Sequence, residues 1–161
     1  MNLTTDWRVG FVDGEGCFTI SINANKETSL GYQVQLEFVV TQSREDLQVL
    51  EGCKAFFQCG VIQKGKDPKT VAYYRVRALQ EHAEIIVPFF EKHALKTRKR
   101  QDFLIYRDAV FLLQKLRLSK EPRNRETLRE CCELAKKANR RKDPKASERL
   151  DNLLSQLQSQ T

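Results

Sequence analysis

The stretch Trp7–Ile22, WRVGFVDGEGCFTISI, changes character in its middle. Its first half reads as a short helix that ends in two acids, Asp13 and Glu15, each followed by a glycine. From Cys17 on, apolar and polar residues alternate, as they do in a half-buried strand. Carboxylates at a helix C-terminus oppose the macrodipole, at a cost of roughly 0.3–1 kcal/mol each at exposed sites. The two acids therefore need an explanation other than helix stability.

The spacing of apolar residues outside this stretch predicts the remaining elements. We expect a helix to about residue 13, strands over 17–25 and 33–40, a helix over 43–57, and a second hairpin formed by GVIQKGK, 60–66, and TVAYYRVRA, 70–78. We expect a helix over 79–93, ended or bent around Pro88. A fourth helix would carry Phe103, Tyr106, Val110 and Leu113 at helical spacing. A further helix would cover 124–139, and a last one would start at Asp143. This order predicts an α+β fold, αββαββα, in which a four-stranded antiparallel sheet is covered by helices on one face. We expect one domain over 1–161, with a core over 1–95 and a basic helical part over 96–161.

Charge is distributed unevenly along the 161 residues, whose net charge is +7. Residues 1–91 contain 9 basic and 12 acidic side chains, whereas residues 92–150 contain 19 basic and 8 acidic ones. Such asymmetry favours a polyanionic partner, nucleic acid before an anionic membrane. Solvated helix faces are the alternative explanation of the same charges.

Several classes of protein are disfavoured by the sequence. No apolar run approaches membrane-spanning length, and the N-terminus lacks a signal-peptide pattern. Five cysteines without a CxxC spacing indicate neither a disulfide framework nor a zinc site. We expect a soluble intracellular protein, of the bacterial cytoplasm or an organelle, with no membrane partner and no small-molecule substrate.

The sheet face opposite the helices would carry long polar side chains that both donate and accept hydrogen bonds. Such side chains match base edges in the major groove, which admits a two-stranded ribbon. Plain solvation is the alternative. The residues that we expect to contact double-stranded DNA are Thr19, Ser21, Asn23, Asn25, Gln33, Gln35, Glu37, Gln63, Lys66, Tyr73, Arg75, Arg77, Lys96 and Arg100.

The segment RVGFVDGEG, Arg8–Gly16, resembles the motif of the LAGLIDADG homing endonucleases, a helix with an internal glycine and an acid–Gly–acid–Gly end. The resemblance extends to VVTQ at the end of the second strand, to KTRKRQ near residue 100, and to the order of elements. It is closest to the single-motif members, which work as homodimers. A chance turn is the alternative for DGEG, as is a calcium loop, which would need an oxygen ligand where Cys17 stands.

The resemblance implies an active site. Glu15 would be the metal-binding catalytic acid and the Gly14 carbonyl a further ligand of Mg²⁺, with Mn²⁺ or Ca²⁺ able to bind the same site. Gln42 would order water near the scissile phosphate, and Arg98 would stabilise the charge that develops there. Two such helices related by a dyad would bring both Glu15 carboxylates together, and a cation between them would reverse their repulsion.

The same resemblance implies a dimer interface along the first helix. Gly10 and Gly14, one turn apart, leave a smooth face for a second helix, and Trp7, Phe11 and Asp13 complete the expected interface. Arg8 and Val9 replace the family's usual Leu and Ala. We expect Val9 to widen the contact between helices, and Arg8 to leave the core or find a partner.

The implied function is that of an intron-encoded homing endonuclease. It would cleave a long, partly palindromic DNA duplex as a homodimer, by metal-dependent phosphodiester hydrolysis that leaves 3′ overhangs. The alternative on the same fold is a non-cleaving RNA maturase or a DNA-binding regulator.

Overall fold

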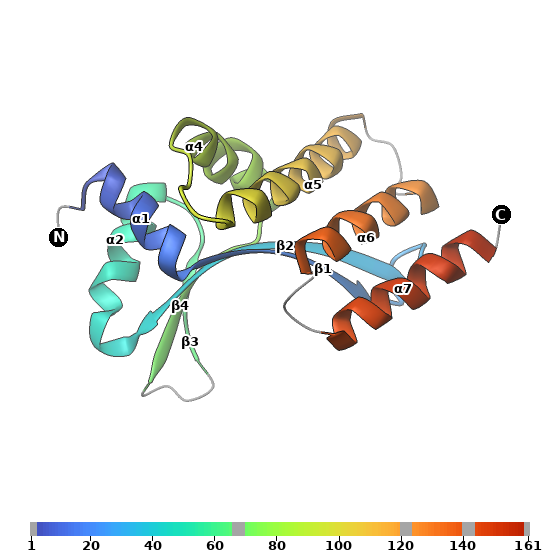
Figure 1. Ribbon diagram of the computed structural model, residues 1–161, viewed down its shortest axis with the longest axis horizontal. Helices are drawn as coiled ribbons and strands as arrows, with labels where there is room; N and C mark the ends of the chain where they lie inside the picture. The colour runs from blue at the N-terminus through green and yellow to red at the C-terminus, as the bar shows by residue number, and fades with distance from the viewer. Residues whose placement is uncertain (1–2, 66–69, 120–123, 140–143, 160–161) are drawn as a thin grey trace. The chain divides into compact units, whose positions relative to one another are not determined.

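The computed structural model describes residues 3–65, 70–119, 124–139 and 144–159 (Figure 1). Four strands form one antiparallel sheet in the order β1-β2-β4-β3, which confirms the predicted α+β fold. In chain order the elements are α1 (Thr5–Glu15), β1 (Gly16–Ala24), β2 (Tyr32–Ser43), a 3₁₀ turn (Arg44–Asp46), α2 (Leu47–Phe57), β3 (Val61–Lys64), β4 (Val71–Val76), α3 (Leu79–Glu81), a π turn (His82–Ile86), α4 (Val87–Lys92), α5 (Lys99–Ser119), α6 (Arg125–Asn139) and α7 (Pro144–Ser159).

The chain divides into two compact units. Unit 1 comprises residues 1–18 and 37–103, and unit 2 comprises residues 19–36 and 104–161. β1, β2 and α5 each contribute residues to both units. This division differs from the expected boundary near residue 95, because the outer part of the first hairpin belongs with the C-terminal helices.

The start and end of α1 follow from its flanking residues. Thr4 caps the helix, since its hydroxyl accepts a hydrogen bond from Trp7 N at 3.2 Å. The helix continues to Glu15, two residues beyond the predicted end. At Gly16 the backbone becomes extended, and a Cβ there would lie 2.6 Å from Val12 Cγ1 and 2.8 Å from the Val12 carbonyl oxygen. Only glycine fits where β1 leaves the helix this closely.

Aromatic side chains form the core of unit 1. The Phe38 ring centroid lies 5.1 Å from that of Phe18 and 5.7 Å from that of Phe90. Tyr74 is fully buried, and its hydroxyl donates a hydrogen bond to the Cys59 carbonyl at 3.1 Å. Burial raises the pKa of this hydroxyl, so it remains a donor at any physiological pH. One face of the sheet is thereby fixed, and the polar residues of the other face stand on a rigid base.

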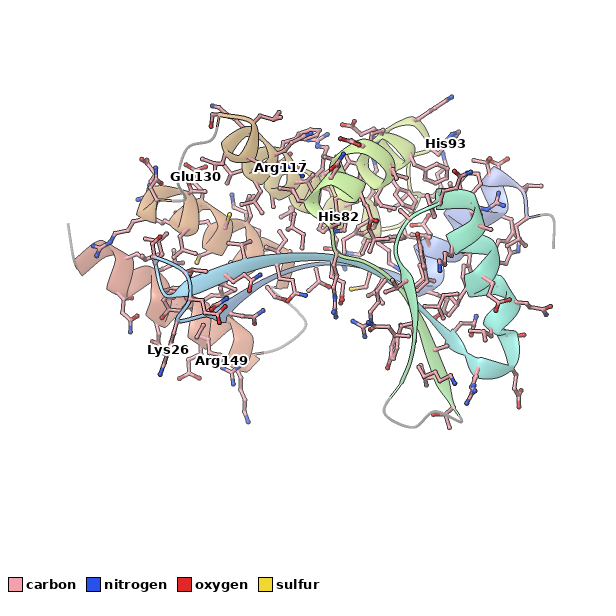
Figure 2. The ribbon with its side chains drawn as sticks, turned by 180° about the vertical axis from the view of Figure 1, so that it is seen from behind. Lys26, His82, His93, Arg117, Glu130 and Arg149 are labelled. Atoms are coloured by element: carbon pink, nitrogen blue, oxygen red, sulfur yellow. The ribbon has the colours of Figure 1, made fainter. Side chains whose placement is uncertain are left out.

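The helical segment over 79–92 does not end at Pro88, so that predicted alternative is wrong, whereas the predicted bend stays a prediction. α3 leads into the π turn, where Val87 N donates to the His82 carbonyl, and α4 follows with Pro88 in its first turn. A π turn shifts the hydrogen-bond register, which suits a residue that has no N–H to donate. His82 is fully buried in this turn, and His93 lies at the end of α4 (Figure 2).

Unit 2 consists of the outer hairpin and the C-terminal helices. At the hairpin tip, Asn25 N donates to the Gly31 carbonyl at 2.8 Å, and Gly31 has a φ of +73°. Tyr106, Val110 and Leu113 of α5 are buried as their spacing predicts, and α6 packs against α7. None of the helices within the described ranges is long and apolar enough to cross a membrane.

Candidate active site and nucleic-acid interface

Asp13 is bound by its own chain. Its carboxylate accepts hydrogen bonds from Lys96 N at 2.6 Å, from Thr97 Oγ1 at 2.8 Å and from Thr97 N at 3.3 Å. Partial burial acts to raise the pKa of Asp13, but these three donors and the charge of Lys99 together hold it below its ordinary value. The Asp13 carboxylate thereby attaches the 96–97 segment to the end of α1. Its expected place at the dimer interface stays a prediction.

Glu15 lies two residues further on, and its carboxylate is not bound by the chain in this way. It is the last residue of α1 and is exposed. Its carboxylate makes no hydrogen bond or ion pair to any residue that the structure describes. Of the two acids in the motif, Glu15 is therefore the one available to an external cation, as the family resemblance implies.

Lys99 was not among the predicted site residues. Its Nζ donates to the Val12 carbonyl at 2.9 Å and to the Gly14 carbonyl at 3.1 Å, two carbonyls at the C-terminal end of α1, of which that of Val12 also accepts from Gly16 N. A cation in this position is favourable to the helix dipole. The contact spans 85 residues in sequence, so helix periodicity could not reveal it. The one local signal is Thr97, whose hydroxyl accepts from Lys99 N at 3.2 Å as α5 begins.

The basic residues beside Lys99 are exposed, namely Lys96, Arg98 and Arg100. Because the Lys96 and Thr97 amides bind Asp13, this segment is anchored at the helix end that carries Glu15. The proximity of the 96–100 segment to the acids is thus a property of the fold. Which of its cations meets a phosphate stays a prediction.

The single chain offers few ligands for a metal ion. Within the described part of the chain, no group of three or more His, Cys, Asp or Glu side chains is placed to hold one. The donors at the end of α1 are the Glu15 carboxylate and the Gly14 carbonyl, whose oxygen also accepts from Lys99. Both are hard oxygen donors of the kind that Mg²⁺ prefers. They fit the implied ion in type, and a second copy of the helix would double their number.

Gln42 is the residue before the last in β2. Its side-chain Oε1 accepts a hydrogen bond from Ser43 N at 2.7 Å, which fixes the amide plane. The Nε2 group remains as a donor. The predicted role in ordering water accordingly rests on Nε2.

The outer face of α1 is open. Trp7 is 40% exposed and stacks on Phe11 with ring centroids 4.8 Å apart. A Cβ added at Gly10 or Gly14 would meet no heavy atom within 4 Å. This face can accept a second helix without rearrangement in the chain itself.

The two departures from the family motif are resolved inside unit 1. The Arg8 guanidinium lies over the Phe56 ring, with Cζ 3.9 Å from its centroid, and its buried Nε has no hydrogen-bond partner among the described residues. Val9 is buried in the core of unit 1. The expectation that Val9 widens the contact between helices was wrong, since its side chain points away from the open face.

The predicted DNA-contacting residues of the sheet make amide–amide hydrogen bonds in unit 2 and ion pairs in unit 1. In unit 2, Asn23 donates to Gln35 at 3.3 Å and Asn25 donates to Gln33 at 3.1 Å, giving two neutral amide pairs. Thr19 and Ser21 are half-buried on the same strand.

In unit 1, Glu37 accepts from Arg75 Nη1 with both carboxylate oxygens at 2.8 Å, and from Arg77 Nε at 2.6 Å. The Arg75 guanidinium lies 4.5 Å from the centroid of the Tyr73 ring. Gln63 is exposed, and with Tyr73 and Arg75 it lines a hollow of about 400 Å³ on this sheet face. Lys66 lies outside the described residues.

The cations of unit 2 do not gather on one side. Lys26 and Arg149 lie at one edge of the unit, while Arg117 lies on its opposite side together with Glu130 (Figure 2).

Comparison with known proteins identifies a family and several relatives of this chain. Residues 9–110 match the family described as LAGLIDADG endonuclease. The chain is 32% identical over 120 residues to "Probable intron-encoded endonuclease Cox1-I1b" of Schizosaccharomyces pombe. The aligned region covers 74% of this chain and 30% of that protein. It spans only 23% to 30% of the length of such curated relatives.

Two solved structures cover nearly the whole chain. The homing endonuclease I-TnaI matches with a TM-score of 0.83 and 36% identity, over 98% of this chain and 99% of its own. I-SmaMI bound to uncleaved DNA in the presence of calcium ions matches with a TM-score of 0.81 and 27% identity, over 93% of this chain but 49% of its own. From the sequence match, the shared fold and the acid–Gly–acid–Gly end of α1, the chain belongs to the LAGLIDADG endonuclease family.

Proposed function

We propose that this protein is a site-specific DNA endonuclease that hydrolyses one phosphodiester bond in each strand of a long, partly palindromic duplex. The observation that carries the proposal is the contrast at the end of α1. Asp13 is saturated by donors from its own chain, whereas Glu15 is exposed and uncommitted among the described residues. An uncommitted carboxylate can bind a metal ion, and a bound metal ion can assist the hydrolysis of a phosphodiester. The relatives named as endonucleases support the same reaction.

Each residue of the site has a separate role in this proposal. The Glu15 carboxylates of two copies, with the Gly14 carbonyls, would hold Mg²⁺, and Mn²⁺ or Ca²⁺ would use the same oxygen donors. A cation there supplies positive charge against the scissile phosphate and the leaving oxygen. Gln42 orients the attacking water through Nε2, and Arg98 stabilises the charge developing on the phosphate. Cuts staggered across the minor groove leave 3′ overhangs.

Two copies of the chain would meet through the open face of α1. The end-to-end match with I-TnaI, and the match with about half of I-SmaMI, support one copy per half of the target. Gly10→Leu should block the close approach of the helices and abolish both association and cleavage, as measured by sedimentation and plasmid cutting. Gln48→Leu adds the same side chain at an exposed position of α2 and should change neither. A wild-type chain that sediments as a monomer while cutting both strands would contradict the dimer.

The reaction itself is tested on a randomised library of duplex targets. In Mg²⁺ the wild-type protein should select and cut a defined site, leaving 3′ overhangs that sequencing of the ends reveals. Chelation of the metal should stop cutting but leave the selected DNA bound. If the protein binds a defined DNA or RNA and cuts neither in any divalent metal, the non-cleaving alternative is correct.

A further inference from the structure

Four side chains of unit 1 form a connected row on the polar face of the sheet, which we call the Glu37 cluster: Tyr73, Arg75, Glu37 and Arg77. Glu37 is at its centre, because both of its oxygens accept from Arg75 Nη1 and Oε1 also accepts from Arg77 Nε. The Tyr73 ring lies against the Arg75 guanidinium. The order of contacts is thus Tyr73 to Arg75 to Glu37 to Arg77.

The row is most exposed at its Arg77 end. The side chains of Glu37 and Arg75 are 16% and 20% exposed, whereas that of Arg77 is 47% exposed. An acid and a base that are mostly removed from water hold each other far more firmly than an exposed pair does. Arg75 therefore fixes Glu37, and the exposed end of the row is the Arg77 guanidinium.

The way Glu37 holds Arg77 leaves a particular set of donors free. Glu37 takes the Nε position, and neither Nη1 nor Nη2 of Arg77 makes a hydrogen bond within the described part of the chain. These two nitrogens form the fork that matches two acceptors side by side. Among the base pairs in the major groove, guanine alone presents two acceptors, N7 and O6, in that arrangement.

We propose that Glu37 is a positioning residue for target recognition, which orients Arg77 to read one guanine in each half-site while Arg75 fixes Glu37. This rests on the proposed function, since it concerns how that protein selects its DNA. Glu37 had been expected to contact a base itself. Its carboxylate already accepts three hydrogen bonds from arginine donors, so its proposed contribution is to geometry and to partial neutralisation of the two cations.

The test is the base preference of DNA binding, measured by selection from a randomised duplex library in Ca²⁺ or without metal, so that cleavage is not the readout. Arg77→Lys keeps the charge but removes the fork, and should lower the guanine preference at one position per half-site by about fivefold or more. Glu37→Gln should flatten the same position and should not weaken total binding, because it removes a negative charge. Glu45→Gln removes an exposed acid outside the cluster and should leave the profile unchanged.

The double variant separates positioning from independent contacts. If Glu37 acts through Arg77, Glu37→Gln combined with Arg77→Lys should lose no more preference than Arg77→Lys alone. Flattening of two different positions by the two single variants would show that Glu37 reads its own base, and would overturn the proposal. So would an unchanged profile for Arg77→Lys, a variant that leaves Glu37 and Arg75 paired and the fold intact. Absence of any site preference in the wild type would instead refute the proposed function.

Discussion

Asp13 and Glu15 lie two residues apart at the end of one helix, but their carboxylates differ in how many hydrogen-bond donors surround them. The region around Asp13 supplies three hydrogen-bond donors from the segment that opens α5. The region around Glu15 supplies none from the described residues and leaves the carboxylate in solvent. Both charges oppose the helix dipole, but for Asp13 the chain itself compensates the cost.

This difference shows how a motif can combine a structural acid with a functional one. Asp13 is part of the scaffold, because its bonds attach the 96–97 segment to α1. Glu15 is left uncompensated, which is the state expected of a group kept for a ligand, since real proteins violate local rules mainly at functional sites. Lys99 combines a structural contact with a place next to the proposed site, because it binds the helix-end carbonyls of the residues before and after Asp13.

The largest effect is expected from Glu15→Gln. This change keeps the shape of the side chain and removes its charge, so cleavage in Mg²⁺ should fall by several orders of magnitude while DNA binding persists. The free energy of unfolding should rise by about 0.3–1 kcal/mol, because a charge opposing the helix dipole is gone. Plasmid cleavage, gel-shift binding and chemical denaturation measure the three quantities. Near-wild-type cutting would remove Glu15 from the proposed site, and a collapse of folding would make it structural.

A smaller loss of activity is expected from Lys99→Met. The change keeps much of the apolar stem but leaves the Val12 and Gly14 carbonyls without their cation. We expect the free energy of unfolding to drop by roughly 0.3–1 kcal/mol and cleavage to drop at least about tenfold, since Gly14 is next to Glu15. Lys115→Met, at an exposed position of α5, is the matched control and should change neither. Equal behaviour of the two variants would mean that the contact to α1 contributes nothing.

Asp13→Asn should mainly affect stability. The amide keeps one acceptor but loses the charge and one of the two acceptor oxygens, so the free energy of unfolding should fall by about 1 kcal/mol. Because the pKa of Asp13 is lower in the folded state, its contribution is complete above its unfolded pKa and disappears as the pH drops through the folded value. Denaturation of the wild type should therefore show a loss of stability on acidification that the variant partly lacks. If the two curves run parallel below pH 5, the Asp13 contacts do not stabilise the fold.

The smallest effect concerns Arg98, an exposed cation on the segment that Asp13 anchors. If it contacts a phosphate, Arg98→Ala should reduce the slope of log binding constant against log salt by about 0.9. The site preference should stay the same, because phosphate contacts carry no sequence information. Fluorescence titrations from 50 to 300 mM salt measure the slope, and an unaltered slope would leave the phosphate to another member of the 96–100 segment.

Much of the fold could be predicted because its elements have clear periods. The alternation in β1 and β2 and the apolar stripe of α5 are local signals, and each gave the correct element. The helix expected over 43–57 begins instead at Leu47, after a 3₁₀ turn that Ser43 caps. The boundary near residue 95 was different. The outer hairpin belongs to the same compact unit as the C-terminal helices, and no local pattern in a sequence reports which distant segments pack together.

The site was accessible to sequence only in part. The motif identified the helix end and its two acids, but the donors that separate their roles come from residues 96, 97 and 99. The effect of Pro88 could be predicted only in part, because a π turn directly before it lets the helical segment continue. Glu37, Arg75 and Arg77 were each singled out as contacts to DNA, but their mutual ion pairs arise from strand pairing and were not foreseen.

The Glu37 cluster constrains how the protein can change its target over evolution. Replacing Arg77 alone would still leave the half-buried Glu37 paired with Arg75, whereas replacing Glu37 alone would leave two cations without their shared acid. A loss of the guanine preference therefore needs a change only at Arg77, whereas a change at Glu37 calls for coordinated substitutions. The neutral amide pairs of the first hairpin carry no such restriction, since an Asn or Gln can be exchanged without leaving a charge behind. On the proposed function, lineages of this protein should therefore diverge first at the amide pairs and last at Glu37.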